Sequence, residues 1–153
     1  MVKQMKLTEH FALSEFEESA TAAEHGIKNH APVELYNRLI TLCEKVLEPV
    51  REHFGRPVTI TSGYRGLTLN RLIGSHDDSQ HVLCEAADIV IAGVEPIDIA
   101  QFIHTHLSYD QCIEEHGRWV HVSYTERRAN REESLTAYKD SEGKTKYRYG
   151  LGE

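Results

Sequence analysis

The segment SQHVLCEAADIVI, residues 79–91, sets the strongest constraint on how this chain can fold. A polar loop runs directly into an apolar stretch that is typical of a buried strand, and each part carries a potential metal ligand. The loop holds His81, and the strand holds Asp88 seven residues later. A loop histidine with a surface carboxylate is one interpretation. Two ligands of one metal ion are the other.

Three stretches show the apolar spacing of helices: residues 13–26, 31–55 and 95–107. Ser14 and Glu17 match a capping box at the start of the first stretch, and Gly26 can end it. Pro49 lies inside the second stretch and should kink or divide the helix, because proline lacks a backbone donor and crowds the preceding turn. Gly55 can close this long helix.

The remaining regular patterns indicate strands and hairpins: residues 57–62, 86–92, 109–124 and 133–150. The first hairpin should turn at Gly117 and Arg118, and the second at residues 141–143. The polar stretch 63–81 is expected to be a loop with room for one helical turn. Together the elements predict a single α+β domain over residues 1–153, with helices packed on a mostly antiparallel sheet.

Composition and charge exclude several classes of function. The 153 residues suit one compact domain, and a net charge of −7 without a long basic run predicts no nucleic-acid partner. No apolar stretch approaches the roughly 20 residues of a membrane span. The N-terminal segment lacks the layout of a secretory signal, and the three scattered cysteines indicate reduced thiols. We therefore expect a monomer that is synthesised in the cytoplasm.

A metal site needs a third ligand from a strand beside Asp88. Catalytic zinc takes three protein ligands from nitrogen, oxygen or sulfur and leaves one position open. The stretch RWVHVSY offers His121, whose neighbours Val120 and Val122 should point to the opposite face of the sheet. A core histidine that is satisfied by a hydrogen bond is the alternative for His121.

Three motifs, in the order found here, resemble those of one family. SQHVLCEAAD resembles the SxHxxGxAxD motif of the zinc-dependent D-alanyl-D-alanine carboxypeptidases and their endopeptidase relatives, the M15 peptidases. ITSGYRGLTLN resembles the family's SGYR segment, and WVHVSY resembles its last metal-ligand strand. The likeness runs from about Leu7 to Leu151 and is greatest to short single-domain phage and prophage members. It implies a zinc D-Ala-D-Ala peptidase (hedgehog/DD-peptidase-like) fold in which His81, Asp88 and His121 bind one zinc ion.

The chain departs from the motif where Cys84 replaces its glycine. Glycine at such a position permits a positive φ or a close approach of the backbone. Cys84 is then either a small buried residue or a soft metal ligand.

The catalytic carboxylate is the second departure, because Arg118 occupies the position where many members carry glutamate. In the most similar branch a glutamate ends the preceding strand, and the segment CIEEHGRWVH offers Glu114 and Glu115. Alignment of the DQCIEE segment favours Glu115, as does a loose hairpin loop. A tight two-residue turn would instead place Glu114 across from His121. We predict that Glu115 is the general base.

Further roles follow from the resemblance. Arg65 of the SGYR segment would bind a substrate carboxylate or the developing oxyanion, for which a planar guanidinium is well suited. Ser79 and Gln80 would donate to substrate or orient the histidine ligand. The alternatives are a solvated loop charge for Arg65 and loop capping for the other two. Trp119 either packs beside the metal or lines the substrate cleft.

The function that this resemblance implies is hydrolysis of an amide bond in peptidoglycan stem peptides or cross-bridges. The enzyme would be endolysin-like or D-Ala-D-Ala carboxypeptidase-like, and Zn2+ would be its cofactor. A non-catalytic zinc or peptide-binding domain of the same fold is the alternative, and Arg118 keeps it open. A virion-associated component that opens the wall is a third hypothesis. Without a signal peptide, access to the wall would need a holin or packaging in a particle.

Overall fold

The computed structural model describes residues 5–152. Its strands are β1 (Thr59–Ser62), β2 (Ala86–Val90), β3 (Gln111–Glu115), β4 (Trp119–Ser123), β5 (Glu133–Lys139) and β6 (Thr145–Tyr149). Its α-helices are α1 (Leu13–Glu17), α2 (Ala20–Glu24), α3 (Tyr36–Leu42), α4 (Glu48–Phe54), α5 (Leu67–Leu72) and α6 (Pro96–His106). A 3-10 turn precedes α3, and a π-helical segment joins α3 to α4: Val33–Leu35 and Cys43–Leu47.

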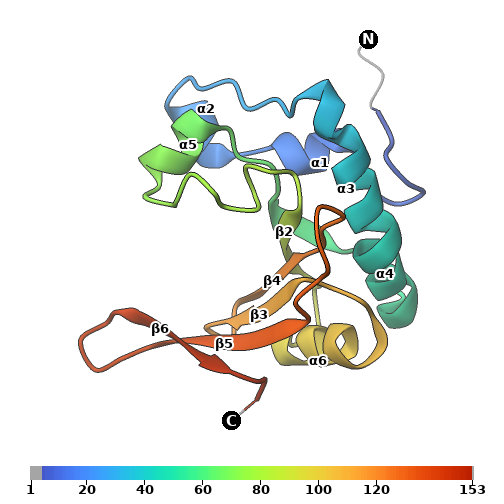
Figure 1. The fold of residues 1–153 in the computed structure, drawn as a ribbon, viewed down its shortest axis with the longest axis vertical. Helices are drawn as coiled ribbons and strands as arrows, with labels where there is room; N and C mark the ends of the chain where they lie inside the picture. Colours follow the sequence, from blue (N-terminus) through green and yellow to red (C-terminus); the bar gives the residue numbers. More distant parts are fainter. Residues whose placement is uncertain (1–4, 153) are drawn as a thin grey trace.

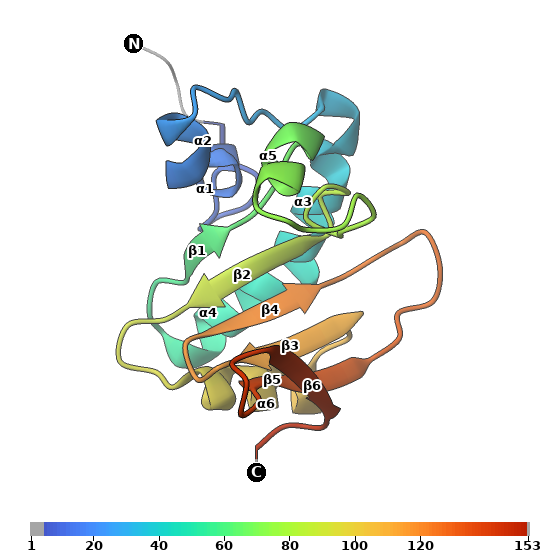
Figure 2. The same cartoon turned by 90° about the vertical axis from the view of Figure 1, so that its left-hand side faces the viewer.

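Within the described residues, the strands form one sheet in the order β1-β2-β4-β3-β5-β6. All neighbouring strands are antiparallel except β3 and β5, which are parallel. Helices α4 and α6 lie behind one face of the sheet, and the other face is turned to the viewer in Figure 2. The predicted α+β class, with helices packed on a mostly antiparallel sheet, is confirmed.

The two central strands give the sheet one apolar and one polar face, because successive side chains alternate between faces. Ala87 of β2 lies opposite Val122 of β4. Ile89 lies opposite Val120 in the same pair of strands. All four side chains are buried in the hydrophobic core together with apolar residues of the helices. The residue between the two on β2 is Asp88, which therefore faces the polar side.

The stretch 13–26 forms two short helices rather than the one helix predicted. Glu18 is extended between α1 and α2, and Ser19 Oγ accepts a hydrogen bond from the first turn of α2. The N-cap of α1 is Ala12 rather than the predicted Ser14, and the Ala12 backbone N–H donates to Glu15 Oε2 at 2.7 Å. Glu17 accepts a hydrogen bond at 2.6 Å from the backbone N–H of Ala31. The Ser19 side chain thus caps a second helix where apolar spacing alone predicts continuity.

The long helical stretch 31–55 adapts to Pro49 without breaking. Pro49 is the second residue of α4, separated from the π-helical segment by one residue, and the wider π turn accommodates a proline that has no N–H to donate. The helix ends, as predicted, at Gly55, which adopts a left-handed conformation with φ 63°. Among the described residues, no helix combines the length and apolar character needed to cross a membrane.

Strands β5 and β6 form the predicted last hairpin, with its turn at residues 141–143. The Asp140 side chain stabilises this turn by accepting hydrogen bonds of 2.9 Å from the N–H groups of Glu142 and Lys144. The hairpin extends outward from the body of the molecule (Figure 1). Because β5 pairs with β3, this hairpin lies next to the β3–β4 hairpin.

Candidate metal centre

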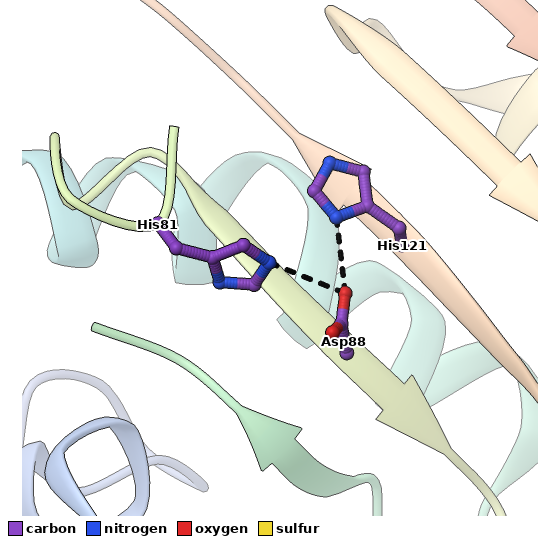
Figure 3. A group of neighbouring side chains, drawn as sticks. All are labelled: His81, Asp88 and His121. Atoms are coloured by element: carbon purple, nitrogen blue, oxygen red, sulfur yellow. Dashed lines mark hydrogen bonds and ion pairs between the residues drawn. The ribbon is translucent and has the colours of Figure 1, made fainter. Parts of the chain in front are cut away.

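His81, Asp88 and His121 come together on the polar face of the sheet (Figure 3). One potential ligand atom from each residue lies within 4.8 Å of the other two. Asp88 Oδ1 is 3.4 Å from His81 Nε2 and 3.0 Å from His121 Nδ1. Two imidazole nitrogens and one carboxylate oxygen are therefore close enough together to bind one metal ion.

Strand pairing explains why residues far apart in sequence meet here. Asp88 of β2 lies directly opposite His121 of β4, and directly opposite residues share one face of a sheet. Val120 and Val122, on either side of His121, are buried in the core on the other face. His121 needs a polar partner in so apolar a strand, and the carboxylate of Asp88, the second proposed ligand, is that partner.

His81 reaches the cluster from a loop and is held by the backbone of the SGYR segment. Its Nδ1–H donates a 2.7 Å hydrogen bond to the carbonyl oxygen of Gly63, which leaves Nε2 facing Asp88. A side chain at Gly63 would collide with the backbone of Phe16, because an added Cβ would lie 2.6 Å from the Phe16 Cα. The sequence did not predict that the Gly63 carbonyl orients His81. The glycine of the SGYR segment was the signal that could have indicated this role.

The electrostatics of the cluster suit a cation. Burial raises the pKa of the Asp88 carboxyl, but its interactions with His121 and His81 outweigh burial and hold this pKa well below its usual range. Burial lowers the pKa of His81, which favours the neutral imidazole that binds metals. An ionised carboxylate beside a neutral imidazole leaves negative charge that a divalent cation can neutralise. The two nitrogen donors and one oxygen donor fit zinc.

Arg65 and Ser79 lie beside the cluster. Arg65 Nη2 donates to Ser79 Oγ at 3.5 Å, and the same oxygen accepts a 3.2 Å hydrogen bond from the backbone N–H of His81. Burial lowers the pKa of Arg65, against the opposing effect of the nearby Asp88 charge. Within residues 5–152, the Arg65 Nε is buried without a hydrogen-bond partner. An unpaired buried donor of this kind is costly unless a ligand completes it.

The β3–β4 loop decides which glutamate faces the cluster. Glu115 pairs with Trp119, so the loop spans three residues, one more than the predicted turn at Gly117 and Arg118. His121 pairs with Ile113 of β3, two residues before Glu115, so Glu115 and Trp119 share the face of His121. Glu114 pairs with Val120 on the opposite face. Burial raises the pKa of Glu115 above its usual value.

The backbone conformation of Cys84 explains why the family motif has a glycine at this position. Its φ is 61°, in the left-handed region that glycine adopts freely and other residues adopt at a cost. The side chain is fully buried in the hydrophobic core, and burial raises the pKa of its thiol to about 12. Among the described residues, the group that could hold a metal does not include Cys84.

Gln80 points away from the metal cluster into a network of buried acids and arginines. Its Nε2 donates to Asp110 at 3.0 Å and to Glu85 at 3.2 Å. Both carboxylates are almost fully buried, and arginines of the β4–β5 loop bind them at 2.8 Å: Arg127, Arg128 and Arg131. This network was not predicted, because its members are scattered in sequence and match no motif. It anchors the loop that carries His81.

A family model described as Peptidase M15 matches residues 9–123, which is more than half of the 153 residues. The matched range contains the cluster of His81, Asp88 and His121, together with Arg65 and Glu115. The β5–β6 hairpin lies outside it. No curated protein matches the chain.

Proposed function

The chain belongs to the peptidase M15 family, and from this membership we propose that it is a zinc-dependent peptidase that hydrolyses an amide bond in peptidoglycan stem peptides or cross-bridges. Peptidases of this family depend on zinc and act on peptides. The observation that carries the proposal is the group of His81, Asp88 and His121 on the same sheet face as Glu115.

His81, Asp88 and His121 would hold the zinc ion. When bound, zinc supplies Lewis acidity, which polarises a scissile carbonyl and makes water a better nucleophile near neutral pH. The hydrogen bond from His81 Nδ1 to Gly63 orients one imidazole before any ligand arrives. Because Asp88 and His121 sit on paired strands, their relative position is set by the sheet rather than by a mobile loop.

We assign Glu115 as the general base. A carboxylate on the metal side can take a proton from the attacking water and pass it to the departing amine. Its place on the face of His121 and the raised pKa that burial confers both support this role. Glu114 stays the alternative from the sequence, but its pairing with Val120 turns it to the other face.

Arg65 would bind the carboxylate of the substrate or the developing oxyanion. Its buried Nε lacks a partner in the described part of the chain, so a substrate oxygen would satisfy it. Ser79 would position Arg65 and His81 together, because its Oγ bonds to both. The contacts of Gln80 with Asp110 and Glu85 favour an anchoring role for this residue over substrate binding.

A non-catalytic binding domain remains the second candidate, and Arg118 in place of the usual acidic residue favours it. Digestion of purified peptidoglycan followed by mass analysis separates the two. The wild type should release new peptide termini, and Glu115→Gln should lose activity on the order of a hundredfold or more while keeping its zinc.

Glu114→Gln is the matched control on a short soluble stem peptide, since it removes the same charge one residue away and should change little there. A wild type that binds zinc yet cuts no peptidoglycan bond would establish the binding domain instead. The same digestion shows whether the cut bond is terminal, as for a carboxypeptidase, or internal, as for an endolysin. Either activity would need the protein to reach the cell wall.

A further inference from the structure

A groove of about 860 Å³ lies between the β3–β4 loop and the β5–β6 hairpin. Its lining comes from both hairpins: Glu114, Glu115, His116, Gly117, Arg118, Trp119, Ala137, Tyr138, Lys139, Thr145 and Tyr147. One wall therefore belongs to the range that matches the family, and the other wall lies beyond it.

The groove is continuous with the face that carries the metal cluster. Trp119 pairs with Glu115, Glu115 pairs with Ala137, and Ala137 pairs with Tyr147. Directly paired residues share a face, so these side chains form one row across β4, β3, β5 and β6. His121 lies on the same face two residues after Trp119. A substrate on the metal could therefore extend past Glu115 along this row into the groove.

The aromatic residues of the groove fit a sugar-containing polymer, and two basic residues stand beside the two acids of its lining to meet the carboxylates of that polymer. Trp119 and Tyr147 offer flat apolar surfaces on opposite sides of Glu115, and Tyr147 is 55 % exposed. Arg118 on one wall and Lys139 on the other can bind carboxylates. The ammonium of Lys139 has a neutral partner, the hydroxyl of Thr145 at 3.0 Å, so its charge is still available.

We propose that the β5–β6 hairpin is an anchoring arm that holds a peptidoglycan strand beyond the bond that is cut. Sugar rings would lie against Trp119 and Tyr147, and carboxylates of the stem peptides would meet Arg118 and Lys139. The inference rests on the proposed peptidase function, because it takes the polymer as the substrate. It also explains why tyrosines stay exposed on a projecting hairpin, where they add little to the core (Figure 1).

The test compares a polymer with a small substrate. The double variant Tyr147→Ala/Lys139→Ala is assayed on insoluble peptidoglycan and on a short soluble stem peptide. The ratio of kcat/KM for the polymer to kcat/KM for the short peptide should fall about tenfold or more, mainly through KM. Lys146→Ala is the matched control: it removes a charge from the same hairpin outside the groove lining, and it should keep the wild-type ratio.

Binding is measured separately, so that failure of the anchoring arm is distinguishable from failure of the peptidase. Co-sedimentation of Glu115→Gln protein with insoluble peptidoglycan should show binding that the added Tyr147→Ala/Lys139→Ala changes weaken. If the wild type cuts nothing but the Tyr147→Ala/Lys139→Ala changes still weaken binding, the peptidase is refuted and the anchoring arm is supported. Equal losses on both substrates, or no loss of binding, would overturn the arm. So would a wild-type dimer that the double variant dissociates, because a second copy would then occupy the groove.

Discussion

Asp88 and Asp110 are two carboxylates with low exposure near the loop that carries His81. The partners of Asp88 are histidines, and those of Asp110 are arginines. Asp88 lies between the imidazoles of His81 and His121. Asp110 is fully buried and accepts hydrogen bonds at 2.8 Å from Arg128 and Arg131. At both sites burial raises the carboxyl pKa, and interactions with these partners outweigh burial and hold the pKa well below its usual range.

The difference lies in the permanence of the neighbouring charge. Guanidinium groups stay charged at all ordinary pH values, so the negative charge of Asp110 is compensated within the chain. An imidazole is neutral when it binds a metal, so the charge of Asp88 is left for an ion. Similar pKa shifts thus mark an anchor in one case and a candidate functional site in the other. Gln80 and His81 are adjacent, and each serves one of the two regions.

The largest effect should follow substitution of the metal-side carboxylate. Asp88→Asn removes the one charged ligand, and we expect zinc affinity to fall on the order of a thousandfold, beyond the 10–100-fold typical of residues that only orient ligands. The fold should persist, because the strands around residue 88 pair through their backbones. Zinc competition titration and circular dichroism measure the two effects. Stoichiometric zinc at unchanged affinity in this variant would contradict the site.

Asp110→Asn should have the next largest effect, and on stability instead of zinc. It removes the negative charge that pairs with Arg128 and Arg131, which should lower the free energy of unfolding by about 3 kcal/mol. This is the lower end for a broken buried pair, because the arginines are partly exposed. Urea denaturation is the measurement. Asp77→Asn is the control: it breaks the exposed ion pair with Arg71 and should leave stability almost unchanged.

Acid should affect the two regions in different pH ranges. The carboxyl pKa values of Asp110 and Glu85 are lowered by arginine hydrogen bonds that outweigh burial, so their stabilisation is present above the ordinary values of 3.8 and 4.5. It is lost as pH falls below that range, by at most about 1.4 kcal/mol per pH unit for each proton bound. Zinc binding needs neutral imidazoles, and protons ordinarily compete for an imidazole at higher pH than for a carboxylate. Zinc should therefore leave before the protein unfolds, and coincident loss of zinc and structure would contradict the separation.

The smallest effect on stability is expected at Cys84, where the backbone adopts a left-handed conformation between the loop of His81 and strand β2. Cys84→Gly relieves a left-handed conformation but loses buried contacts and makes the unfolded chain more flexible, so stability should change by less than about 1 kcal/mol. Cys112→Gly removes the same atoms from the buried strand β3. It should cost at least about 1 kcal/mol more, since no left-handed conformation is relieved there. Thermal denaturation of both variants compares them, and equal losses would show that the bend at Cys84 stores no strain.

The sequence by itself identified the residues of the candidate site because they lie in motifs of fixed spacing. Alternation around His121 was enough to predict that Val120 and Val122 point to the opposite face of the sheet. The hairpin turn at residues 141–143 and the end of the long helix at Gly55 were also predicted, because turn and cap preferences are local. The division of 13–26 was not, since apolar spacing continues across Ser19 while its side chain caps a new helix.

Only the tertiary structure decided the features that depend on contacts between distant segments. Glu114 and Glu115 differ by one position, and the three-residue loop, with positive φ at His116 and Gly117, turns Glu115 to the metal face. The approach of Gly63 to Phe16 and the arginine network around Asp110 likewise join segments with no common pattern. Local preferences act within a few residues, whereas register and burial depend on which strands and loops pack together, so they follow from the folded chain.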